Sequence, residues 1–200
     1  MRATAHRQVL TAIILAGGKA SRMKGKDKAF LKINHEPLIK RQLRLLKKTF
    51  KQIIIVTNTY KKYINFKGVK VISDVIPHRG PLGGIYSGLL TSKDKYNFVV
   101  ACDMPFINLE LIKYMFKKSA GYDVVIPYVN NRYEPLFCVY SKKCIGFIKQ
   151  LIDKRIFKIS KLFTFVKVKK ISKKEVLRFG QAKTIFMNIN TLQDLEQLRK

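Results

Sequence analysis

Short apolar runs alternate with longer amphipathic stretches along most of the chain. The apolar runs are rich in β-branched side chains, as in residues 53–56, and such runs are typical of buried strands. We therefore predict strands at residues 11–16, 53–56, 69–72, 98–102, 124–126, 135–140, 163–168 and 184–187. The stretches between them approach helical spacing, and we predict helices at residues 37–50, 60–66, 80–90, 109–118, 142–154 and 192–199.

The alternation of strands and helices predicts the fold class. It favours an α/β three-layer sandwich, in which a mostly parallel, Rossmann-like sheet carries helices on both faces. The chain has 200 residues, of which 47% are hydrophobic, and this is enough for one good core. We predict a single domain over residues 1–200, with residues 1–10 as a loose N-terminal extension. Residues 172–183 have the least regular pattern. Thr191 is the predicted N-cap of the last helix, with Asp194 three residues further on.

Glycine or a short polar residue follows most of the predicted strands. These residues are Gly17 and Gly18, Asn58, Asp74, Asp103, and finally Asn188 and Asn190. In open α/β sheets, ligands bind beyond the carboxyl ends of the strands. We therefore expect this polar chemistry to gather on one rim of the sheet.

The loop at residues 15–28 holds the most concentrated polar chemistry. Its glycines allow backbone N–H groups to approach a phosphate or a base closely. Arg22 can form two parallel hydrogen bonds to phosphate oxygens, and Lys28 adds a compact positive charge. The spacing matches neither a Walker A loop nor Gly-x-Gly-x-x-Gly. On these residues alone, a nucleotide-binding loop and a basic surface loop remain equally open.

Asp103 ends an apolar strand, and we interpret it as a magnesium ligand. Mg²⁺ prefers oxygen ligands and is often held by one or two carboxylates together with substrate phosphates. The alternative is that Asp103 caps the following helix, but Asn108 is better placed for that role. Residues 80–84 form a glycine-rich helix start, which can bind an anion, lie against a flat ring, or simply make a tight turn.

The strong excess of basic residues indicates which kinds of partner the protein attracts. The chain has 41 Lys and Arg against 12 Asp and Glu, a formal charge of +29. Such a surface attracts polyanions. Because the basic residues are spread evenly and are not interleaved with aromatic residues, we favour a compositional bias and an anionic small substrate over nucleic acid.

The cysteines and the hydropathy indicate a reduced, soluble protein. Cys102, Cys138 and Cys144 have the spacing of neither a disulfide framework nor a zinc site. No apolar run approaches the roughly 20 residues that span a bilayer, and residues 1–8 do not resemble a signal peptide. We predict a cytoplasmic protein that does not bind membranes.

Several motifs taken together resemble the molybdenum cofactor guanylyltransferases, which belong to the nucleotidyltransferase superfamily. That family reads Leu-Ala-Gly-Gly, a variable stretch, Arg-Met-Gly-Gly, one variable residue and Asp-Lys, and residues 15–28 are similar to it. Further similarities follow in the family's order at residues 37–38, Asp74, 80–84, 102–106, 134–136 and 188–191. The resemblance covers roughly residues 11–199, and motifs in the right order are more specific than any single one.

The resemblance implies an activity and a set of roles. The family transfers GMP from GTP to the terminal phosphate of molybdopterin, which yields the guanine dinucleotide form of the cofactor and pyrophosphate. When the roles of the family's residues are assigned to the matching positions, the GTP site would comprise Leu15, Ala16, Gly17, Gly18, Lys28, Asp74 and Asp103. The catalytic residues would be Arg22, Lys28 and Asp103, with Asp103 holding Mg²⁺, and the acceptor side would be Asn188 and Asn190. The implied partners are GTP, molybdopterin and, as a hypothesis, proteins that deliver or accept the cofactor. We expect a monomer.

Two departures from the family and three alternatives accompany this interpretation. Lys24 replaces the first glycine of Arg-Met-Gly-Gly, and Asn58 lies two residues beyond the place of a family asparagine. The alternatives are a cytidylyl or sugar-phosphate transferase, a nucleic-acid-binding module driven by charge, and a catalytically silent nucleotide sensor on the same fold. Gly18 and the Gly-Pro-Leu at residues 80–82 favour guanine within the resemblance.

Overall fold

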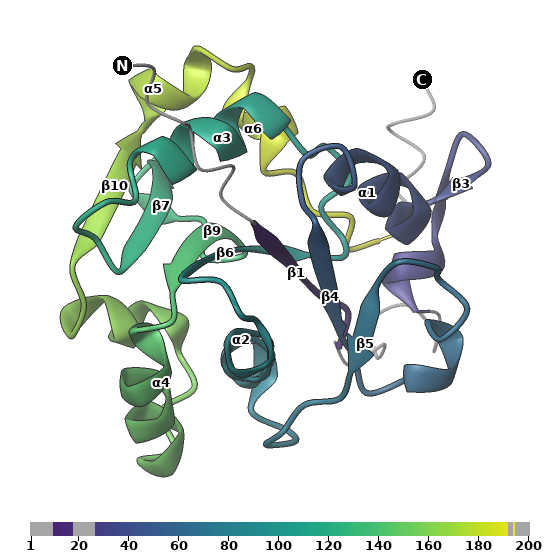
Figure 1. Ribbon diagram of the computed structural model, residues 1–200. Coiled ribbons are helices and arrows are strands. Elements are labelled where there is room, and N and C mark those ends of the chain that lie inside the picture. The colour runs from purple at the N-terminus through teal and green to yellow at the C-terminus, as the bar shows by residue number, and fades with distance from the viewer. Residues whose placement is uncertain (1–9, 18–26, 192–193, 195–200) are drawn as a thin grey trace, which may run out of the picture.

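The computed structural model describes residues 10–17, 27–191 and 194, and its centre is a twisted eight-stranded sheet (Figure 1). The strand order is β10-β7-β9-β6-β1-β4-β5, with β8 paired to β7. The strands are β1 (Thr11–Leu15), β4 (Gln52–Val56), β5 (Lys70–Ile72), β6 (Tyr96–Ala101), β7 (Val124–Val129), β8 (Arg132–Tyr133), β9 (Phe137–Ser141) and β10 (Val168–Ser172). Only β8 and β9 run against the common direction. The predicted mostly parallel α/β fold class is confirmed.

Helices cover both faces of the sheet. On one face lie α1 (Leu38–Leu46), α3 (Leu109–Lys117), α5 (Lys173–Leu177) and α6 (Ala182–Ile185). On the other face lie α2 (Gly80–Thr91) and α4 (Cys144–Asp153), below the sheet in Figure 1. The remaining elements are the 3-10 helices η2 (Lys28–Phe30), η3 (Tyr60–Lys62) and η4 (Ile159–Thr164), and the short hairpin of β2 (Lys32–Ile33) and β3 (Glu36–Pro37).

The alternation of side chains along β1 shows why the core has two halves. Ala12 and Ile14 belong to the cluster that contains α1 and α3, whereas Ile13 belongs to the cluster around α2 and α4. All three are fully buried. Because successive side chains of a strand point to opposite faces, a central strand must be apolar throughout.

Gly88 allows α2 to pack directly on β1. A Cβ atom at this glycine would lie 2.5 Å from Cγ2 of Ile13, a separation that real Cβ atoms do not show. The absence of a side chain at Gly88 therefore allows this close approach of the helix to the strand.

Two predicted strands are wrong. Residues 163–168 mostly precede β10, and the 3-10 helix η4 occupies the start of this region. Residues 184–187 overlap α6, in which Ala182, Ile185 and Phe186 are buried with the spacing of a helix. The stretch 172–183 also contains regular structure, because a capping box between Ser172 and Glu175 starts α5. The predicted helix at residues 192–199 lies almost wholly outside the described residues.

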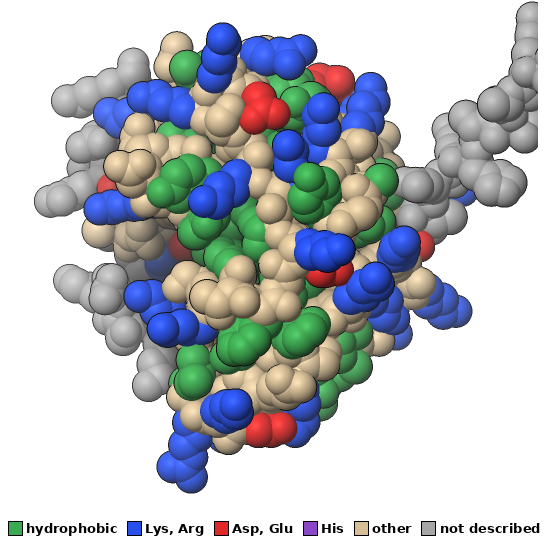
Figure 2. All heavy atoms as spheres, turned by 90° about the vertical axis from the view of Figure 1, so that its left-hand side faces the viewer, with side chains coloured by type: hydrophobic (Ala, Val, Ile, Leu, Met, Phe, Trp, Pro, Cys, Tyr) green, Lys and Arg blue, Asp and Glu red, His purple; other side chains and the backbone are tan. Residues whose placement is uncertain are grey.

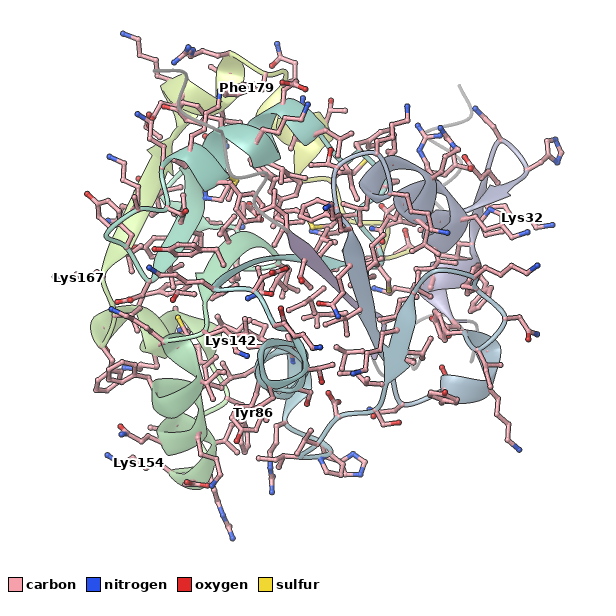
Figure 3. The ribbon with its side chains drawn as sticks, in the orientation of Figure 1. Lys32, Tyr86, Lys142, Lys154, Lys167 and Phe179 are labelled. Carbon is pink, nitrogen blue, oxygen red and sulfur yellow. The ribbon has the colours of Figure 1, made fainter. Side chains whose placement is uncertain are left out.

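The distribution of basic side chains on the described surface agrees with the interpretation that they are spread over the molecule. Lysine and arginine side chains are scattered over the face shown in Figure 2, without a continuous stripe. Lys32, Lys154 and Lys167 lie at the periphery on different sides of the molecule (Figure 3). Cys102, Cys138 and Cys144 are free and buried, as expected of thiols in a core. Among the described helices, none combines the length and the apolarity that a membrane crossing requires.

Candidate functional site

The chain segments that follow β1, β4 and β6 meet at one rim of the sheet. The backbone N–H of Cys102 donates to Leu15 O at 3.0 Å, and that of Ala16 donates to Val56 O at 2.8 Å. The hydroxyl of Thr57 also donates to Ala16 O at 3.1 Å. The end of β1 is therefore held between its two neighbours, and Gly17 emerges from it exposed.

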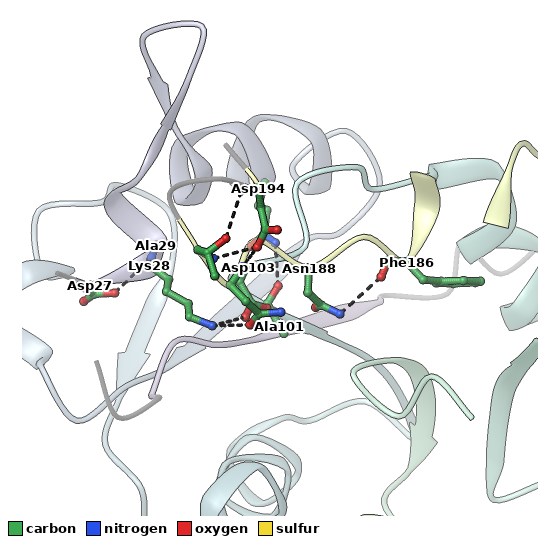
Figure 4. Close-up of polar contacts among 11 residues, drawn as sticks. Asp27, Lys28, Ala29, Ala101, Asp103, Phe186, Asn188 and Asp194 are labelled. Atoms are coloured by element: carbon green, nitrogen blue, oxygen red, sulfur yellow. Dashed lines mark hydrogen bonds and ion pairs between the residues drawn. The ribbon is translucent and has the colours of Figure 1, made fainter. Parts of the chain in front are cut away.

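Lys28, Asp103 and Asn190 converge on this rim from three distant parts of the sequence, and Figure 4 shows Lys28 reaching towards Asp103. Lys28 Nζ lies 3.1 Å from Asp103 Oδ2 and donates to Asn190 Oδ1 at 2.7 Å. The side chains of Lys28 and Asp103 are 24% and 18% exposed, so the pair remains open to a ligand. The predicted gathering of these three residues is present.

Asp27 sets the position of Lys28. Its carboxylate caps η2 by accepting from the N–H of Ala29 at 3.2 Å, and it accepts from the hydroxyl of Tyr63 at 3.1 Å. Tyr63 is completely buried, and both this burial and the nearby charge of Asp27 raise the pKa of its hydroxyl far above the ordinary value. The phenol is therefore a permanent donor, and it fixes the carboxylate beside Lys28.

Gln42 and Ile189 hold the segment that carries Asp103. The buried Nε2 of Gln42 donates to Ala101 O and to Met104 O, each at 2.8 Å, and so braces both sides of Asp103 from α1. The N–H of Ile189 donates to Asp103 O at 2.9 Å. Asp103 does not cap the next helix, because Asn108 accepts from the N–H of Leu111 at 2.9 Å.

A second polar group lies next to Leu15. Asn58 Nδ2 donates to Asp74 Oδ2 at 3.3 Å, and a Cβ at Gly84 would lie 3.0 Å from Leu15 Cδ2 and 3.7 Å from Asp74 Oδ1. Burial raises the pKa of the Asp74 carboxyl, although Asn58 and His78 oppose this shift. Asp74 Oδ1 is buried and has no hydrogen-bond partner among the described residues. A buried acceptor in this state needs a donor from elsewhere.

The segment that carries Asn188 and Asn190 follows α6 and not the predicted strand. Both asparagines are exposed. Asp194 accepts from the backbone N–H of Asn190 at 2.7 Å and of Thr191 at 2.8 Å, and Thr191 Oγ1 accepts from the N–H of Asp194 at 3.1 Å. The predicted cap by Thr191 is therefore confirmed, and it orders the segment beside Lys28.

The oxygen ligands at the rim suit a metal cation that is also coordinated by substrate phosphate. Within the described residues, no three His, Cys, Asp or Glu side chains cluster as a metal site would. Asp103 nevertheless offers one partly exposed carboxylate, which is sufficient when phosphate and water supply the other ligands. Its present partner is the ammonium group of Lys28, so the carboxylate is already paired with a positive charge.

Of the predicted site residues, Leu15, Ala16, Gly17, Lys28, Asp74, Asp103, Asn188 and Asn190 all lie along this rim or against it. Gly18, Arg22 and Lys24 lie outside the described residues. The structure adds Asn58, which the sequence left unassigned, together with Gln42 and the pair of Asp27 and Tyr63. Asp27 carried a sequence signal because it directly precedes Lys28, and Asn58 carried one because it follows an apolar strand.

Comparison with known proteins gives the class of the fold and the site. The family described as MobA-like NTP transferase domain matches residues 12–168. The chain belongs to this family.

Relatives with similarity over nearly the whole length narrow the comparison. A probable molybdenum cofactor guanylyltransferase of Clostridium perfringens (strain 13) is 40% identical, and the alignment covers 95% of this chain and 96% of that protein. The molybdenum cofactor guanylyltransferase of Desulfosudis oleivorans is 33% identical over 94% and 93% of the two chains. The crystal structure of molybdopterin-guanine dinucleotide biosynthesis protein A from Archaeoglobus fulgidus superposes with a TM-score of 0.81 at 25% identity, covering 95% of this chain and 97% of that one.

Proposed function

We propose that this protein is a molybdenum cofactor guanylyltransferase, which transfers GMP from GTP to the terminal phosphate of molybdopterin and releases pyrophosphate. The observation that carries the proposal is the contact of Lys28 with both Asp103 and Asn190. It brings a cation for phosphate, a carboxylate for Mg²⁺ and a polar acceptor-side residue to one point. The full-length similarity to guanylyltransferases supports the same conclusion.

On the nucleotide side, Leu15, Ala16 and Gly17 line the base and ribose, and Asp74 receives a hydrogen bond from the nucleotide. The unsatisfied Oδ1 of Asp74 supports this role, since a base or ribose donor would complete it. Asn58 then acts as a positioning residue, because its amide holds the other oxygen of Asp74. Gly18 belongs to the same GTP site, and Arg22 braces the departing pyrophosphate.

The reaction requires charge neutralisation and positioning more than acid–base chemistry. A phosphate oxygen of the acceptor attacks the α-phosphorus of GTP, a new P–O bond forms, and the bond between the α-phosphorus and the bridging oxygen breaks with its electron pair leaving on pyrophosphate. The acceptor phosphate is already ionised at neutral pH, so no general base is needed. Lys28 turns from Asp103 to the phosphates and offsets the leaving-group charge. Asp103 would hold Mg²⁺, which supplies further positive charge to the phosphate oxygens.

Asn188 and Asn190 place the acceptor phosphate. Asn190 contacts Lys28 directly, and Asn188 lies two residues before it, on the segment that the backbone of Ile189 ties to Asp103. The monomeric state, the cytoplasmic location, the single-domain organisation and any protein that delivers or accepts the cofactor stay predictions.

The test is a comparison of nucleotides and of matched aspartate variants. Pyrophosphate release with molybdopterin is measured for GTP, CTP, UTP and ATP, with and without Mg²⁺. We expect Mg²⁺-dependent release with GTP only, and a loss of about a hundredfold or more in Asp103→Ala. Asp153→Ala is the control, because Asp153 is exposed on α4 and pairs only with Lys149 among the described residues. A preference for CTP would replace guanylyl by cytidylyl transfer, and equal use of all four nucleotides would refute the guanine assignment.

A further inference from the structure

A hollow of about 510 Å³ lies between the hairpin of β7 and β8 and the helix α6. Val129 and Arg132 line one wall, Lys183 and Phe186 line the other, and Glu134 also contributes to the lining. The hairpin turns at Asn130 and Asn131, whose φ angles of 49° and 60° are those of a tight two-residue turn. None of these residues is needed for the nucleotide site described above.

Glu134 is the unusual residue of this hollow. Its backbone is fixed, because its N–H donates to Pro127 O at 3.1 Å and its carbonyl accepts from the N–H of Phe137 at 3.0 Å. Its carboxylate has neither a hydrogen bond nor an ion pair with any residue that the structure describes. Burial raises the pKa of Glu134 to about 7, and Arg132 only partly opposes this shift. The carboxylate thus lines the hollow without a donor from the described residues and is free to accept hydrogen bonds from a ligand bound there.

The hollow adjoins the acceptor side of the reaction centre. Asn188 Nδ2 donates to the carbonyl oxygen of Phe186 at 3.4 Å, and Figure 4 shows the two residues on one continuous segment. Two residues further on, Asn190 contacts Lys28. A molecule whose phosphate lies at Asn190 can therefore extend past Asn188 into the hollow.

The strand order separates this hollow from the nucleotide side. Asp74 follows β5 at one end of the sheet, Asp103 follows β6 near the middle, and Glu134 lies between β8 and β9 on the opposite side of β6. The hollow and Asp74 thus lie on opposite sides of Asp103 along the sheet.

We propose that the hollow binds the pterin ring of the acceptor, and that the carboxylate of Glu134 accepts hydrogen bonds from the 2-amino group and the N3–H of that ring. This inference rests on the proposed function for the identity of the acceptor. A carboxylate offers two acceptor oxygens side by side, which match two adjacent donors on one edge of a flat ring. Arg132 and Lys183 add positive charge for the anionic part of the acceptor. Glu134 is therefore a specificity-determining residue.

Binding without turnover tests the recognition itself. The full-length protein is titrated, in the absence of GTP, with 6-methylpterin and with 6-methyllumazine, which carries an oxygen in place of the 2-amino group, and binding is followed by their fluorescence. We expect the wild type to prefer the pterin by on the order of tenfold, and Glu134→Gln to lose that preference. Glu110→Gln is the control, because Glu110 is exposed on α3 and should leave the preference unchanged. A wild type that binds both rings equally overturns the proposal.

Steady-state kinetics distinguish the pterin from guanine, which carries the same pair of donors. If Glu134 recognises the acceptor, Glu134→Gln raises the KM for molybdopterin on the order of tenfold and leaves kcat and the KM for GTP within about twofold. If the KM for GTP rises in its place, Glu134 recognises guanine and the proposal is wrong. A wild type that binds the pterin selectively but transfers no GMP refutes the proposed function alone, so the two failures remain distinguishable.

Discussion

Lys28 Nζ lies 3.1 Å from Asp103 Oδ2, although the two residues are 75 positions apart in the chain. The same ammonium group donates to Asn190, 162 positions from Lys28. One side chain thus connects the glycine-rich loop, the end of β6 and the last described segment. Because the pair is partly exposed, its attraction contributes at most about 1 kcal/mol to stability. The contact between Lys28 and Asp103 is therefore important for the functional site and not for the stability of the fold.

Replacing Lys28 should reduce activity and leave the fold intact. In Lys28→Met we expect GMP transfer to fall about a hundredfold, because the charge that offsets the leaving group is gone. The melting temperature should stay within a few degrees of the wild type. Lys149→Met is the control, since Lys149 is an exposed lysine that pairs with Asp153 on α4. Full activity in Lys28→Met would exclude this role.

The pair of Asp27 and Tyr63 should show energetic coupling. Asp27→Ala leaves the buried Tyr63 hydroxyl without its carboxylate acceptor, which costs about 1–3 kcal/mol in the free energy of unfolding. Tyr63→Phe removes the hydroxyl, so the added cost of Asp27→Ala in that background should be smaller. Urea unfolding of the two single variants and the double variant measures the coupling. Strictly additive costs would show that the hydrogen bond does not link them.

Two glycine-to-alanine substitutions should change the free energy of unfolding in opposite directions. Gly88→Ala places a methyl group against Ile13, with the nearest separation at 2.5 Å, and overpacking of this kind costs about 1–3 kcal/mol. Gly146→Ala on α4 meets nothing within 4 Å and should stabilise by up to about 1 kcal/mol through helix propensity. Chemical unfolding of the two variants checks the contrast. Equal effects would contradict the close packing of α2 on β1.

Glu134 should make the protein less stable as the pH rises from about 4.5 to about 7. Its pKa is about 7 in the folded protein, against an ordinary value of 4.5, so the folded state binds more protons than the unfolded state between these values. Stability therefore declines from about pH 4.5 to pH 7, by at most about 3 kcal/mol from this group. The decline should be smaller in Glu134→Gln than in the wild type, because the contribution of Glu134 is gone, and it should be retained in Glu110→Gln, as measured by urea unfolding at pH 5 and pH 8. An identical pH dependence in all three proteins would contradict the burial of this carboxylate.

The sequence predicted the centre of the sheet well because central strands are apolar on both faces. Residues 11–16 and 53–56 differ from β1 and β4 by a single residue at one end. The edge strand β10 was misplaced, since it pairs on one side only and has lysines at Lys169 and Lys170, where no continuous apolar run can form. Residues 184–187 are too short for their periodicity to separate a strand from the last turn of a helix.

The site residues were predictable one by one, but the contacts that position them were not. Gly17, Asp74 and Asp103 each follow an apolar strand, so the topology alone brings them to one rim. Gln42 lies within an ordinary amphipathic helix pattern, and its hydrogen bonds to Ala101 and Met104 depend on how α1 packs on the sheet. The family resemblance included residues 134–136, but the lack of a partner for the Glu134 carboxylate depends on its surroundings in the fold and could not be predicted from the sequence.

The hydrogen bond from Ile189 to Asp103 bears on the order in which the enzyme is completed during translation. Every strand of the described sheet precedes residue 188 in the chain, so the nucleotide half of the rim emerges from the ribosome before Asn188 and Asn190 do. Synthesis of the last described segment then supplies both Asn190 and the backbone bond from Ile189 that holds Asp103. The nucleotide side and the acceptor side of the rim are therefore completed together, by the last part of the described chain to be made.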